Sequence, residues 1–459
     1  MNIHIQGIGG TFMSGVALLA QALGHQVRGS DRALYPPMGD QITAAGIPVE
    51  LNYTTPLDAS WVDQVIVGNA LSRGVPQVED MLNQGISMDS GPGWLVRHVL
   101  PGRRVLAVSG THGKTTTSSL LVWILRSAGL DPGYLIGGMP GFSDVSAHLG
   151  TSPWFVIEAD EYDSAFFDRR AKCLQLHPYG MIVNNLEFDH ADIYNNLTEI
   201  QCVFKDWIKC LPREGCLICP AEHPHLVEIA EVGQLLSQVE SIHTKSGWHI
   251  EAQSEDFKTA AWCFNDTVLG VFSGDWLCPH LGDNALAAAV MAHRCVGLEP
   301  SEITQALNHF PGVKRRMECI GQRDQSVLYD DFAHHPTAIA QTLATMGKRH
   351  PHQPILVCLE LGSYTLKQSF QVEALANALG TAHQIYIMKP ESGTLGFECQ
   401  SLNDLMPDQI QWFESPQLLL DAVQVAVRSN TVVLTLSSRA FEGVRQPLFD
   451  WWRSVVMAS

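Results

Sequence analysis

The chain has 459 residues, which at roughly 150 residues per domain predicts about three domains. Lys and Arg number 29 against 47 Asp and Glu, and the net charge of −18 argues against a protein that binds nucleic acid through a basic face. Apolar residues make up 46% and charged residues only 17%, a composition that excludes a disordered or coiled-coil chain. Any phosphate binding must therefore take place in local pockets, against the field of the whole protein.

No apolar run approaches the roughly 20 residues that cross a membrane. The first residues, MNIHIQGIGG, lack the basic start of a signal peptide and are typical of a strand that enters a glycine turn. The eleven cysteines are odd in number and scattered, as expected in a reducing compartment. Cys216 and Cys219 lie in an apolar run that favours a buried strand over a metal site. We therefore expect a soluble cytoplasmic protein.

The N-terminal segment, residues 1–102, alternates short β-rich runs with a helical pattern. Strands are predicted at Ile3–Gln6, Gln26–Gly29 and Gln64–Val67, and a helix over Met13–Leu23. Such alternation favours a parallel sheet with helices on both faces. The Pro-Gly pair at 101–102 predicts the first domain boundary.

A glycine-rich turn, GIGGTFMSG (residues 7–15), follows the first strand. It resembles a dinucleotide-binding fingerprint, with Asp31 about 20 residues further on to bind a ribose hydroxyl. Phe12 stands where that fingerprint requires glycine, which weakens a nicotinamide interpretation. The turn can equally hold the diphosphate of a sugar nucleotide, and a purely structural turn is the alternative.

The middle segment, residues 103–312, contains the sharpest motif. We expect strands at Val105–Val108, Trp154–Ile157 and Gly180–Val183, and helices over Thr116–Ser127 and Asp283–Arg294. The sequence GTHGKT (residues 110–115) lies between the first of these strands and the first helix.

Backbone N–H groups of such a turn, together with the helix N-terminus, form a cradle for phosphates. Lys114 can reach the outer phosphates, and the Thr115 hydroxyl can bind Mg²⁺. The match to the P-loop pattern is incomplete, because Val108 stands where the first glycine belongs. A structural turn with a surface lysine is the alternative, but the strand–loop–helix context predicts nucleotide-phosphate binding.

Two polar stretches follow later strands of the middle segment. EADEYD (residues 158–163) begins with Glu158 and places carboxylates where Mg²⁺ is held beside a P-loop, although such acids alone are usually a solvated turn. NNLEFDHAD (residues 184–192) supplies acids and His190. These groups can bind a second hard cation or orient a carboxylate substrate, and a packing histidine is the alternative.

The C-terminal segment, residues 313–459, restarts the alternation of strands and helices. Its predicted strands are Ser326–Tyr329, Ile355–Leu359, Gln384–Met388 and Thr431–Leu436.

Two motifs of this segment carry chemistry. GVKRRME (residues 312–318), at the second boundary, offers guanidinium groups to clamp a transferring phosphoryl group, and a solvated basic linker is the alternative. YDDFAHHP (residues 329–336) offers acids for ribose hydroxyls and imidazoles for a nucleotide. The tandem histidines could instead bind zinc, but no Cys or third His stands at a suitable spacing.

Taken in order, these motifs resemble the Mur ligases of bacterial cell-wall synthesis, ATP-dependent enzymes that form amide bonds. The resemblance covers essentially the whole chain and implies three tandem α/β domains. These are a Rossmann-like UDP-sugar-binding domain (1–102), a P-loop ATPase-like central domain (103–312) and a Rossmann-like peptide-binding domain (313–459). Within the family, the chain is most similar to the murein peptide ligases of peptidoglycan recycling, in residues 10–13, 68–74, 90–95, 145–150, 158–167 and 184–192.

The resemblance implies that ATP and Mg²⁺ drive the joining of UDP-N-acetylmuramate to the L-Ala amine of the murein tripeptide L-Ala-γ-D-Glu-meso-diaminopimelate, through an acyl phosphate. A UDP-N-acetylmuramate–L-alanine ligase is the alternative within the family. Outside it, a nicotinamide oxidoreductase and a nucleotide-binding protein without catalysis are the rivals.

The resemblance also implies roles for single residues. Catalysis is implied for Lys114, Glu158, His190 and Arg316, and Mg²⁺ ligation for Thr115, Glu158 and His190. ATP binding is implied for Gly110, Thr111, His112, Gly113, Lys114, Thr115, Thr116, Asn284, Arg316 and Asp331. Binding of the UDP substrate is implied for Gly7, Gly9, Gly10, Thr11, Ser30, Asp31 and Asn69.

Two stretches depart from the murein peptide ligase pattern. Glu360–Lys367 carries Gly362 where an arginine is expected, and Ser437–Gly443 replaces a glycine-rich loop. Both lie in the domain that receives the peptide, so the amine acceptor stays open. Some Mur ligases carry a carbamoylated lysine as a metal bridge, but Phe204 matches that position better than Lys205 does.

Overall fold

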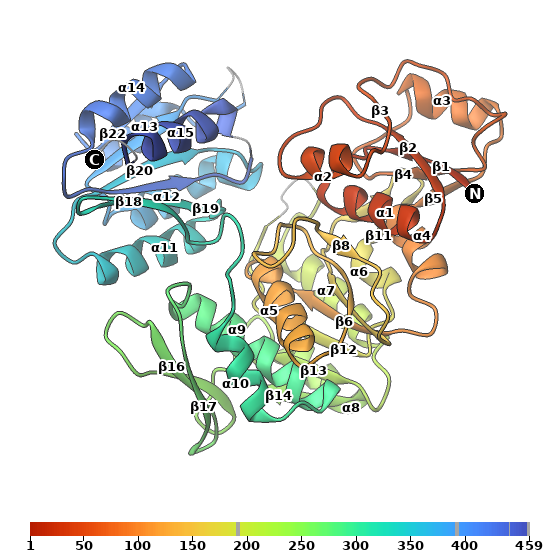
Figure 1. Ribbon diagram of the computed structural model, residues 1–459, viewed down its shortest axis with the longest axis horizontal. Helices are drawn as coiled ribbons and strands as arrows, with labels where there is room; N and C mark the ends of the chain where they lie inside the picture. Colours follow the sequence, from red (N-terminus) through yellow and green to blue (C-terminus); the bar gives the residue numbers. More distant parts are fainter. Residues whose placement is uncertain (190–192, 391–393, 440, 457–459) are drawn as a thin grey trace.

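A computed structural model describes residues 1–189, 193–390, 394–439 and 441–456. The chain forms three lobes, each built on a mainly parallel sheet with helices packed against it (Figure 1). We call them the N-terminal, middle and C-terminal lobes after their sheets, β1–β5, β6–β14 and β18–β23. The N-terminal and C-terminal lobes lie side by side above the middle lobe in this view.

The N-terminal lobe contains a five-stranded, fully parallel sheet in the order β3-β2-β1-β4-β5. Ile3 and Ile5 of its central strand are completely buried, as expected for a strand covered on both faces. Its elements are β1 (Asn2–Gln6), α1 (Thr11–Ala22), β2 (Gln26–Ser30), α2 (Met38–Ala44), β3 (Val49–Glu50), β4 (Gln64–Val67), α3 (Pro76–Asn83), β5 (Met88–Ser90) and α4 (Gly91–His98).

The middle lobe contains a seven-stranded sheet in the order β14-β13-β12-β6-β9-β7-β8, parallel except for β8. The elements up to α7 are β6 (Arg104–Ser109), α5 (Lys114–Ser127), β7 (Gly133–Leu135), β8 (Ala147–His148), β9 (Trp154–Glu158), β10 (Asp163–Ala165), β11 (Asp168–Ala171), α6 (Lys172–Gln175), β12 (Gly180–Val183) and α7 (Leu197–Ile208). They are followed by β13 (Cys216–Cys219), α8 (Val227–Leu236), β14 (Gln238–Ser241), α9 (Pro279–Met291), the π-helical η1 (Ala292–Val296) and α10 (Pro300–Asn308).

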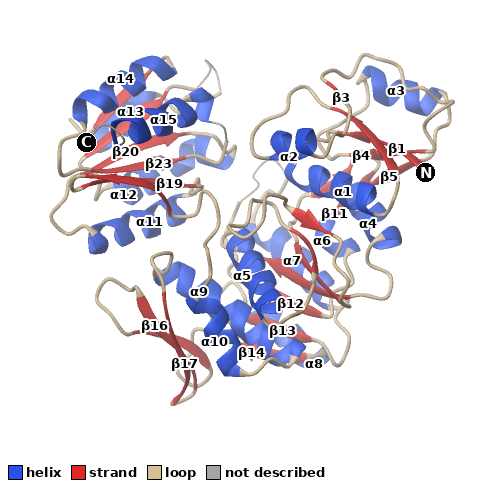
Figure 2. Cartoon of the chain, in the orientation of Figure 1, coloured by secondary structure: helices blue, strands red, loops and turns tan. Residues whose placement is uncertain are grey.

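A separate antiparallel sheet of three strands, β15 (Trp248–Ala252), β16 (Thr259–Phe264) and β17 (Thr267–Ser273), extends from the middle lobe (Figure 2). The strands predicted from the sequence did not include these three, although Ala260–Phe264 in β16 is an apolar run; β17 is largely exposed. Trp248 and Trp262 stack with ring centroids 6.1 Å apart and join the core that contains α9. Side-chain packing against the middle lobe therefore contributes more to the stability of these strands than the alternation of apolar and polar residues within them.

The C-terminal lobe contains a six-stranded sheet in the order β18-β19-β23-β20-β21-β22, in which only the pair β18–β19 is antiparallel. Its elements up to β21 are β18 (Glu318–Arg323), β19 (Ser326–Asp331), α11 (Pro336–Arg349), β20 (Ile355–Glu360), η2 (Thr365–Lys367), η3 (Ser369–Gln371), α12 (Val372–Leu379) and β21 (Gln384–Met388). Then follow α13 (Cys399–Leu405), β22 (Ile410–Phe413), α14 (Pro416–Ala426), β23 (Val432–Leu436), η4 (Phe441–Gly443) and α15 (Arg445–Val456).

The strands predicted from apolar runs are present in all three lobes, and the expected α/β fold class is confirmed. The helix predicted from Thr116 begins two residues earlier, at Lys114, because Gly113 is its N-cap. The helix predicted over Asp283–Arg294 begins at Pro279 and changes to a π-helical turn after Met291.

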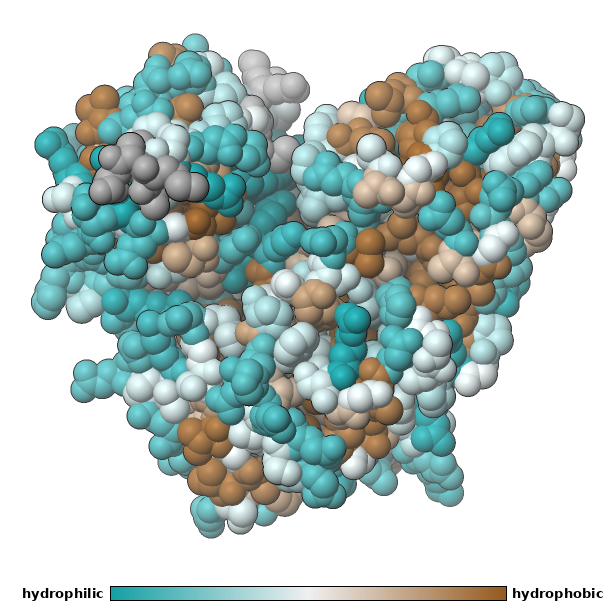
Figure 3. Space-filling view, in the orientation of Figure 1, coloured by the Kyte–Doolittle hydropathy of each residue, from teal (hydrophilic) through white to brown (hydrophobic). Residues whose placement is uncertain are grey.

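Cys216 and Cys219 lie in the buried strand β13, as expected, and all eleven cysteines are free thiols. Among the described residues, no helix combines the length and the apolar character that crossing a membrane requires. The space-filling view shows a hollow between the N-terminal and C-terminal lobes, with mostly hydrophilic residues at its base (Figure 3).

Candidate active site

The glycine turn between β6 and α5 packs closely against neighbouring chain segments. Gly110 and Gly113 have φ values of +125° and +83°, a backbone region that favours glycine. A Cβ atom on Gly113 would lie 2.4 Å from Oδ1 of Asn284, on α9. Gly113 and Asn284, both predicted for the nucleotide site, are therefore in contact, and the absence of a side chain on Gly113 allows this close approach.

Lys114 opens α5 and folds back over the turn, where its Nζ donates a hydrogen bond to the Gly110 carbonyl over 2.6 Å. Burial alone would lower the pKa of Lys114, but the carboxylates of Glu161, Glu158 and their neighbours outweigh it and raise the pKa. The lysine is therefore a half-buried cation held beside the turn, which suits it to stabilise phosphate charge.

Thr115, Glu158 and Arg316 meet at the carboxyl edge of the middle sheet. The Thr115 hydroxyl donates to the Glu158 carboxylate, with Oγ1 lying 3.1 and 3.0 Å from its two oxygens. The backbone N–H of Gly137 donates to the same carboxylate over 2.8 Å. Arg316, which precedes β18, donates from Nη2 to the Thr115 hydroxyl over 3.2 Å and so joins two lobes.

Asp331 ends β19 and is held by its own lobe. The backbone N–H groups of Met317 and Ala333 donate to its carboxylate over 2.6 and 2.8 Å. Burial raises the pKa of Asp331, although the nearby Arg316 guanidinium acts in the opposite direction. That guanidinium also lies over the Phe332 ring, 4.5 Å from its centroid, and burial lowers the pKa of Arg316.

These groups surround one cavity of about 490 Å³ to which all three lobes contribute. Thr11 and Phe12 of the N-terminal lobe line it, as do Asn284 of the middle lobe and Asp331 of the C-terminal lobe. The other predicted site residues that line it are Thr111, His112, Gly113, Lys114, Thr115, Thr116, Glu158 and Arg316. A cavity of this size with a lysine, an arginine and several carboxylates can hold a phosphorylated ligand and a hard cation.

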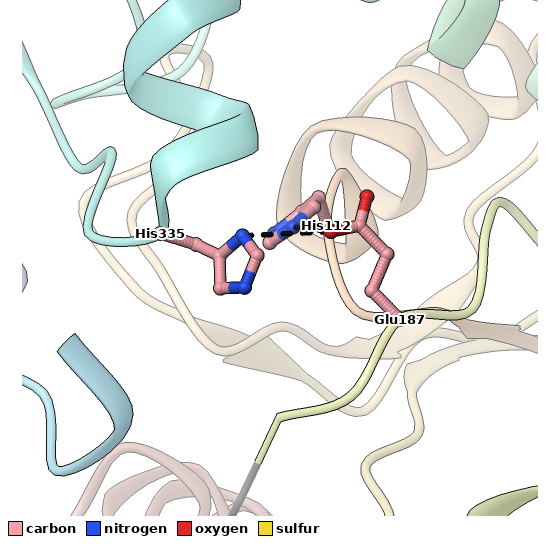
Figure 4. A group of neighbouring side chains, drawn as sticks. All are labelled: His112, Glu187 and His335. Atoms are coloured by element: carbon pink, nitrogen blue, oxygen red, sulfur yellow. Dashed lines mark ion pairs between the residues drawn. The ribbon is translucent and has the colours of Figure 1, made fainter. Parts of the chain in front are cut away.

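A second group of side chains crosses the boundary between the middle and C-terminal lobes (Figure 4). His112 comes from the glycine turn, Glu187 from the loop after β12, and His335 from the start of α11. The Glu187 carboxylate lies 3.8 Å from Nε2 of His112 and 3.5 Å from Nδ1 of His335, and it accepts a hydrogen bond from the Thr337 hydroxyl over 2.8 Å.

The titration of this group follows from its contacts. Burial would raise the pKa of Glu187, but His112, the Thr337 hydroxyl and His335 lower it to about 2. Burial lowers the pKa of His335, so its imidazole is neutral at neutral pH.

The glycine turn of the N-terminal lobe has its amide groups already paired. Gly7 and Ile8 donate to the Ser30 carbonyl, Gly10 donates to the Gly7 carbonyl, and Gly9 donates to the Asp31 carboxylate over 2.8 Å. The amides that remain are those of the first turn of α1, which begins at Thr11 and has no side-chain cap. An anion at this edge would therefore be bound by the free backbone amides at the start of α1 and not by the glycine amides, which are already paired.

Ser30 ends β2, Asp31 follows it, and Asn69 follows β4. Both strands pair with β1, so these residues share one edge with the turn. The Asp31 carboxylate also accepts from the Tyr53 hydroxyl. The Ser30 side chain is completely buried and donates to Gln77 over 2.6 Å, so of these three predicted residues Asp31 and Asn69 keep partly accessible side chains.

Three protein-family models match the chain in order: Mur ligase family, catalytic domain (residues 2–101), Mur ligase middle domain (108–292), and Mur ligase, glutamate ligase domain (315–439). The UDP-N-acetylmuramate--L-alanyl-gamma-D-glutamyl-meso-2,6-diaminoheptandioate ligase of Escherichia coli (strain K12) is 39% identical over 451 residues, 98% of each chain. This protein belongs to the Mur ligase family.

Further comparisons separate two kinds of relative of this Mur ligase. A murein peptide ligase of Psychrobacter arcticus 273-4, known as a crystal structure, is 35% identical, covers 98% of each chain and gives a TM-score of 0.76. The UDP-N-acetylmuramate--L-alanine ligase of Salinispora arenicola (strain CNS-205) is 30% identical over 84% of this chain and 74% of its own. The alanine ligase of Thermotoga maritima has a TM-score of 0.81 at 22% identity, which shows the shared fold alone.

The family resemblance implies that His190 is a metal ligand, and Lys205 and Phe204 both lie near the position of a metal-bridging lysine. His190 lies outside the described residues. Lys205, on α7, forms an ion pair with Glu228, whereas Phe204 is completely buried. Neither side chain lines the cavity.

The sequence did not predict the contacts of Glu187 and Thr337. Glu187 was noted only as one acid of the polar stretch that contains His190, and Thr337 lies just beyond the YDDFAHHP motif. Their partners come from another lobe, so no local pattern reports the contact. The sequence offered one indication: Glu187 lies within a polar motif that follows a strand, and Thr337 lies directly after another such motif.

Proposed function

We propose that this Mur ligase joins UDP-N-acetylmuramate to the L-Ala amine of the murein tripeptide L-Ala-γ-D-Glu-meso-diaminopimelate, driven by ATP. The observation that carries the proposal is the shared cavity, where Lys114, Thr115, Glu158 and Arg316 meet from two lobes with Thr11 of the third lobe in its wall. Relatives named for this reaction are 38–39% identical over 98% of the chain. Relatives named for the alanine reaction reach 84% coverage at 29–33% identity, which supports the tripeptide as acceptor.

ATP is assigned to the glycine turn and the surfaces that face it. The amides at the start of α5 and the Lys114 ammonium bind its phosphates, an assignment that the loop geometry and the position of the cation support. Asn284 touches the turn from α9 and contacts the adenine, while Asp331 binds the ribose from the C-terminal lobe.

The residues present also fit Mg²⁺. The Thr115 hydroxyl and the Glu158 carboxylate already converge within 3.1 Å of each other, and both are hard oxygen donors of the kind that Mg²⁺ prefers. These two residues would hold the ion, with His190 assigned to a second one. When bound, the cation neutralises phosphate charge next to the attacked phosphorus.

The UDP substrate is assigned to the edge of the N-terminal sheet. We place its diphosphate at Gly7, Gly9, Gly10 and Thr11, with the amides of the first α1 turn as the donors still available. Asp31, Ser30 and Asn69 lie on the uridine side. We keep the domain boundaries at 102/103 and 312/313, so each lobe contributes one part of the reaction.

The reaction has two steps. A lactyl carboxylate oxygen attacks the γ-phosphorus of ATP, and the bond to the β-phosphate oxygen breaks to give ADP and an acyl phosphate. Lys114 and Arg316 donate to the oxygens on which negative charge grows. The L-Ala amine then attacks the acyl carbon, loses a proton, and expels inorganic phosphate to leave the amide. Contacts between lobes, such as Arg316 with Thr115, exclude water from the reactive acyl phosphate.

An isotope experiment tests this proposal. UDP-N-acetylmuramate labelled with ¹⁸O in the lactyl carboxylate is incubated with ATP, Mg²⁺ and the tripeptide, and the released phosphate is analysed by mass spectrometry. The acyl-phosphate route transfers a labelled oxygen to the phosphate, and release requires all three substrates. Unlabelled phosphate, or release that is independent of the sugar nucleotide, would overturn the proposal.

A further inference from the structure

His335, the second of the tandem histidines in the C-terminal lobe, lies next to His112 of the middle lobe, which is far from it in sequence. His112, Glu187 and His335 each offer one ligand atom, and these atoms lie within 4.8 Å of one another (Figure 4). The separations from Glu187 are 3.5 and 3.8 Å. Ligand atoms around a tetrahedral zinc ion lie about 3.3 Å apart, so a small contraction brings these three atoms to one ion.

The carboxylate of this cluster is oriented by a hydrogen bond, as metal-binding carboxylates usually are. The Thr337 hydroxyl donates to the Glu187 carboxylate over 2.8 Å and orients it. The His112 backbone N–H donates to the Asn185 side chain over 2.8 Å, which anchors the base of that side chain. Within the described residues, Nε2 of His112 is buried without a hydrogen-bond partner. A buried ring nitrogen aimed at a carboxylate is a group that a metal ion would satisfy.

The ligand types select the metal. Two imidazoles and one carboxylate form the set found in open zinc sites, with a position left for water or a ligand oxygen. Mg²⁺ prefers oxygen ligands, and the Thr115–Glu158 pair offers those instead. The long contact from the Thr337 amide to Nδ1 of His335, at 3.4 Å, is weak enough for a metal to replace.

We infer that His112, Glu187 and His335 form a binding site for a transition-metal ion of the Zn²⁺ type, separate from the Mg²⁺ site of the proposed reaction. His112 and Glu187 belong to the middle lobe and His335 to the C-terminal lobe, so a bound ion joins the two lobes across the cavity. Such a bridge holds the cleft closed beside the nucleotide turn and therefore inhibits turnover, which needs the cleft to open.

A second cluster, formed by His249, Glu251 and Cys263 on the β15–β16 hairpin, provides an internal comparison. Its carboxylate side chain is about half exposed at 53%, and Nε2 of His249 lies 3.4 Å from it. His249 and Glu251 stand two residues apart on one strand and join no lobes. We assign the metal to the first cluster, where a hydroxyl orients the carboxylate and the ligands come from two lobes.

The experiment uses the full chain, freed of metal with EDTA and dialysed, without nucleotide. Co²⁺ is titrated and its visible absorption recorded, because this ion reports nitrogen and oxygen ligands directly. One equivalent should bind, and excess Mg²⁺ should not displace it, whereas Zn²⁺ should. His335→Gln and Glu187→Gln should each weaken binding at least about tenfold, and Thr337→Val by about tenfold through the loss of the orienting hydroxyl. The matched control His249→Gln should bind as the parent does.

Several results would overturn the inference. They are the absence of a cobalt spectrum in the parent, a spectrum unchanged in both His335→Gln and Glu187→Gln, loss of the spectrum in His249→Gln, or its loss in Glu158→Gln. Circular dichroism in EDTA checks that each variant is folded, and three variants of one cluster keep the test decisive if one is not. Zn²⁺ should also inhibit the parent more strongly than Thr337→Val, and equal inhibition would contradict the bridge between lobes.

Discussion

The Arg316 guanidinium donates a hydrogen bond to the Thr115 hydroxyl over 3.2 Å, and this contact joins the C-terminal lobe to the middle lobe beside the glycine turn that we propose binds phosphate. The same hydroxyl donates to Glu158, so one threonine connects the arginine to the carboxylate assigned to Mg²⁺. The phosphate site is therefore complete only when the lobes are together. A ligase with a water-sensitive intermediate requires that coupling.

Arg316 is expected to contribute to the rate more than to substrate affinity. Arg316→Ala removes a donor aimed at the phosphate site and should lower kcat by roughly 10²- to 10³-fold. Arg316→Lys retains the charge but not the planar fork of donors, so its rate should be intermediate. Steady-state kinetics with saturating ATP measures both variants. A kcat within twofold of the parent for Arg316→Ala would contradict the assignment.

Gly113 is expected to be essential because of its surroundings as well as its backbone. Gly113→Ala places a Cβ at φ +83° and 2.4 Å from Asn284, so ATP binding should be lost. Gly129→Ala is the matched control beyond the other end of α5, with φ +78° and no atom within 4 Å of the added carbon. It should cost about 1–2 kcal/mol of stability and retain activity. Calorimetric titration with ATP distinguishes the two, and equal losses of affinity would refute this explanation.

Lys114 is expected to act on ATP alone. Lys114→Ala removes the cation from the turn and should abolish phosphate release, whereas binding of UDP-N-acetylmuramate to the N-terminal lobe should stay nearly unchanged. Phosphate release and equilibrium binding of the sugar nucleotide are the two measurements. Retained turnover would show that the lysine does not bind phosphate.

His4 predicts an acid-sensitive N-terminal lobe. Burial lowers its pKa from 6.5 to about 4, so the unfolded chain binds more protons than the folded chain between these values. Stability is therefore retained above pH 6.5 and lost as the pH falls toward 4, by about 2 kcal/mol at pH 5. His4→Gln should remove this part of the loss. Urea unfolding of both proteins at pH 7.5 and pH 5 measures it, and an identical pH dependence would contradict the prediction.

The sequence predicted those parts of the fold that depend on local periodicity. Continuous apolar runs such as Trp154–Ile157 and Gly180–Val183 became buried central strands, since only a sheet covered on both faces accommodates them. The β15–β17 sheet was missed because its stability comes from Trp248 and Trp262 packing on the lobe. Tertiary contacts of that kind leave no periodic signal.

The same distinction holds for the site. Lys114 lies just after β6 and Glu158 ends β9, which pairs with β6 in one parallel sheet, so the convergence of these two residues at its carboxyl edge could be expected. Asp331 ends β19 of another sheet, so its approach depends on how the lobes lie together. The contact of Glu187 with Thr337 could not be expected, because it depends on how one lobe rests on another. The hydrogen bond from the Gly9 amide to Asp31 could not be predicted either. An aspartate that accepts from its own glycine turn and one that binds a ribose hydroxyl occur in the same sequence pattern.

The most direct test of the account is a competition for the acceptor. The enzyme is given UDP-N-acetylmuramate, ATP and Mg²⁺ with equal concentrations of L-Ala and the tripeptide, and the products are separated by mass. We predict that the tripeptide adduct forms in large excess, because the relatives named for that reaction align with the whole chain. A predominance of the L-Ala adduct would contradict the assignment.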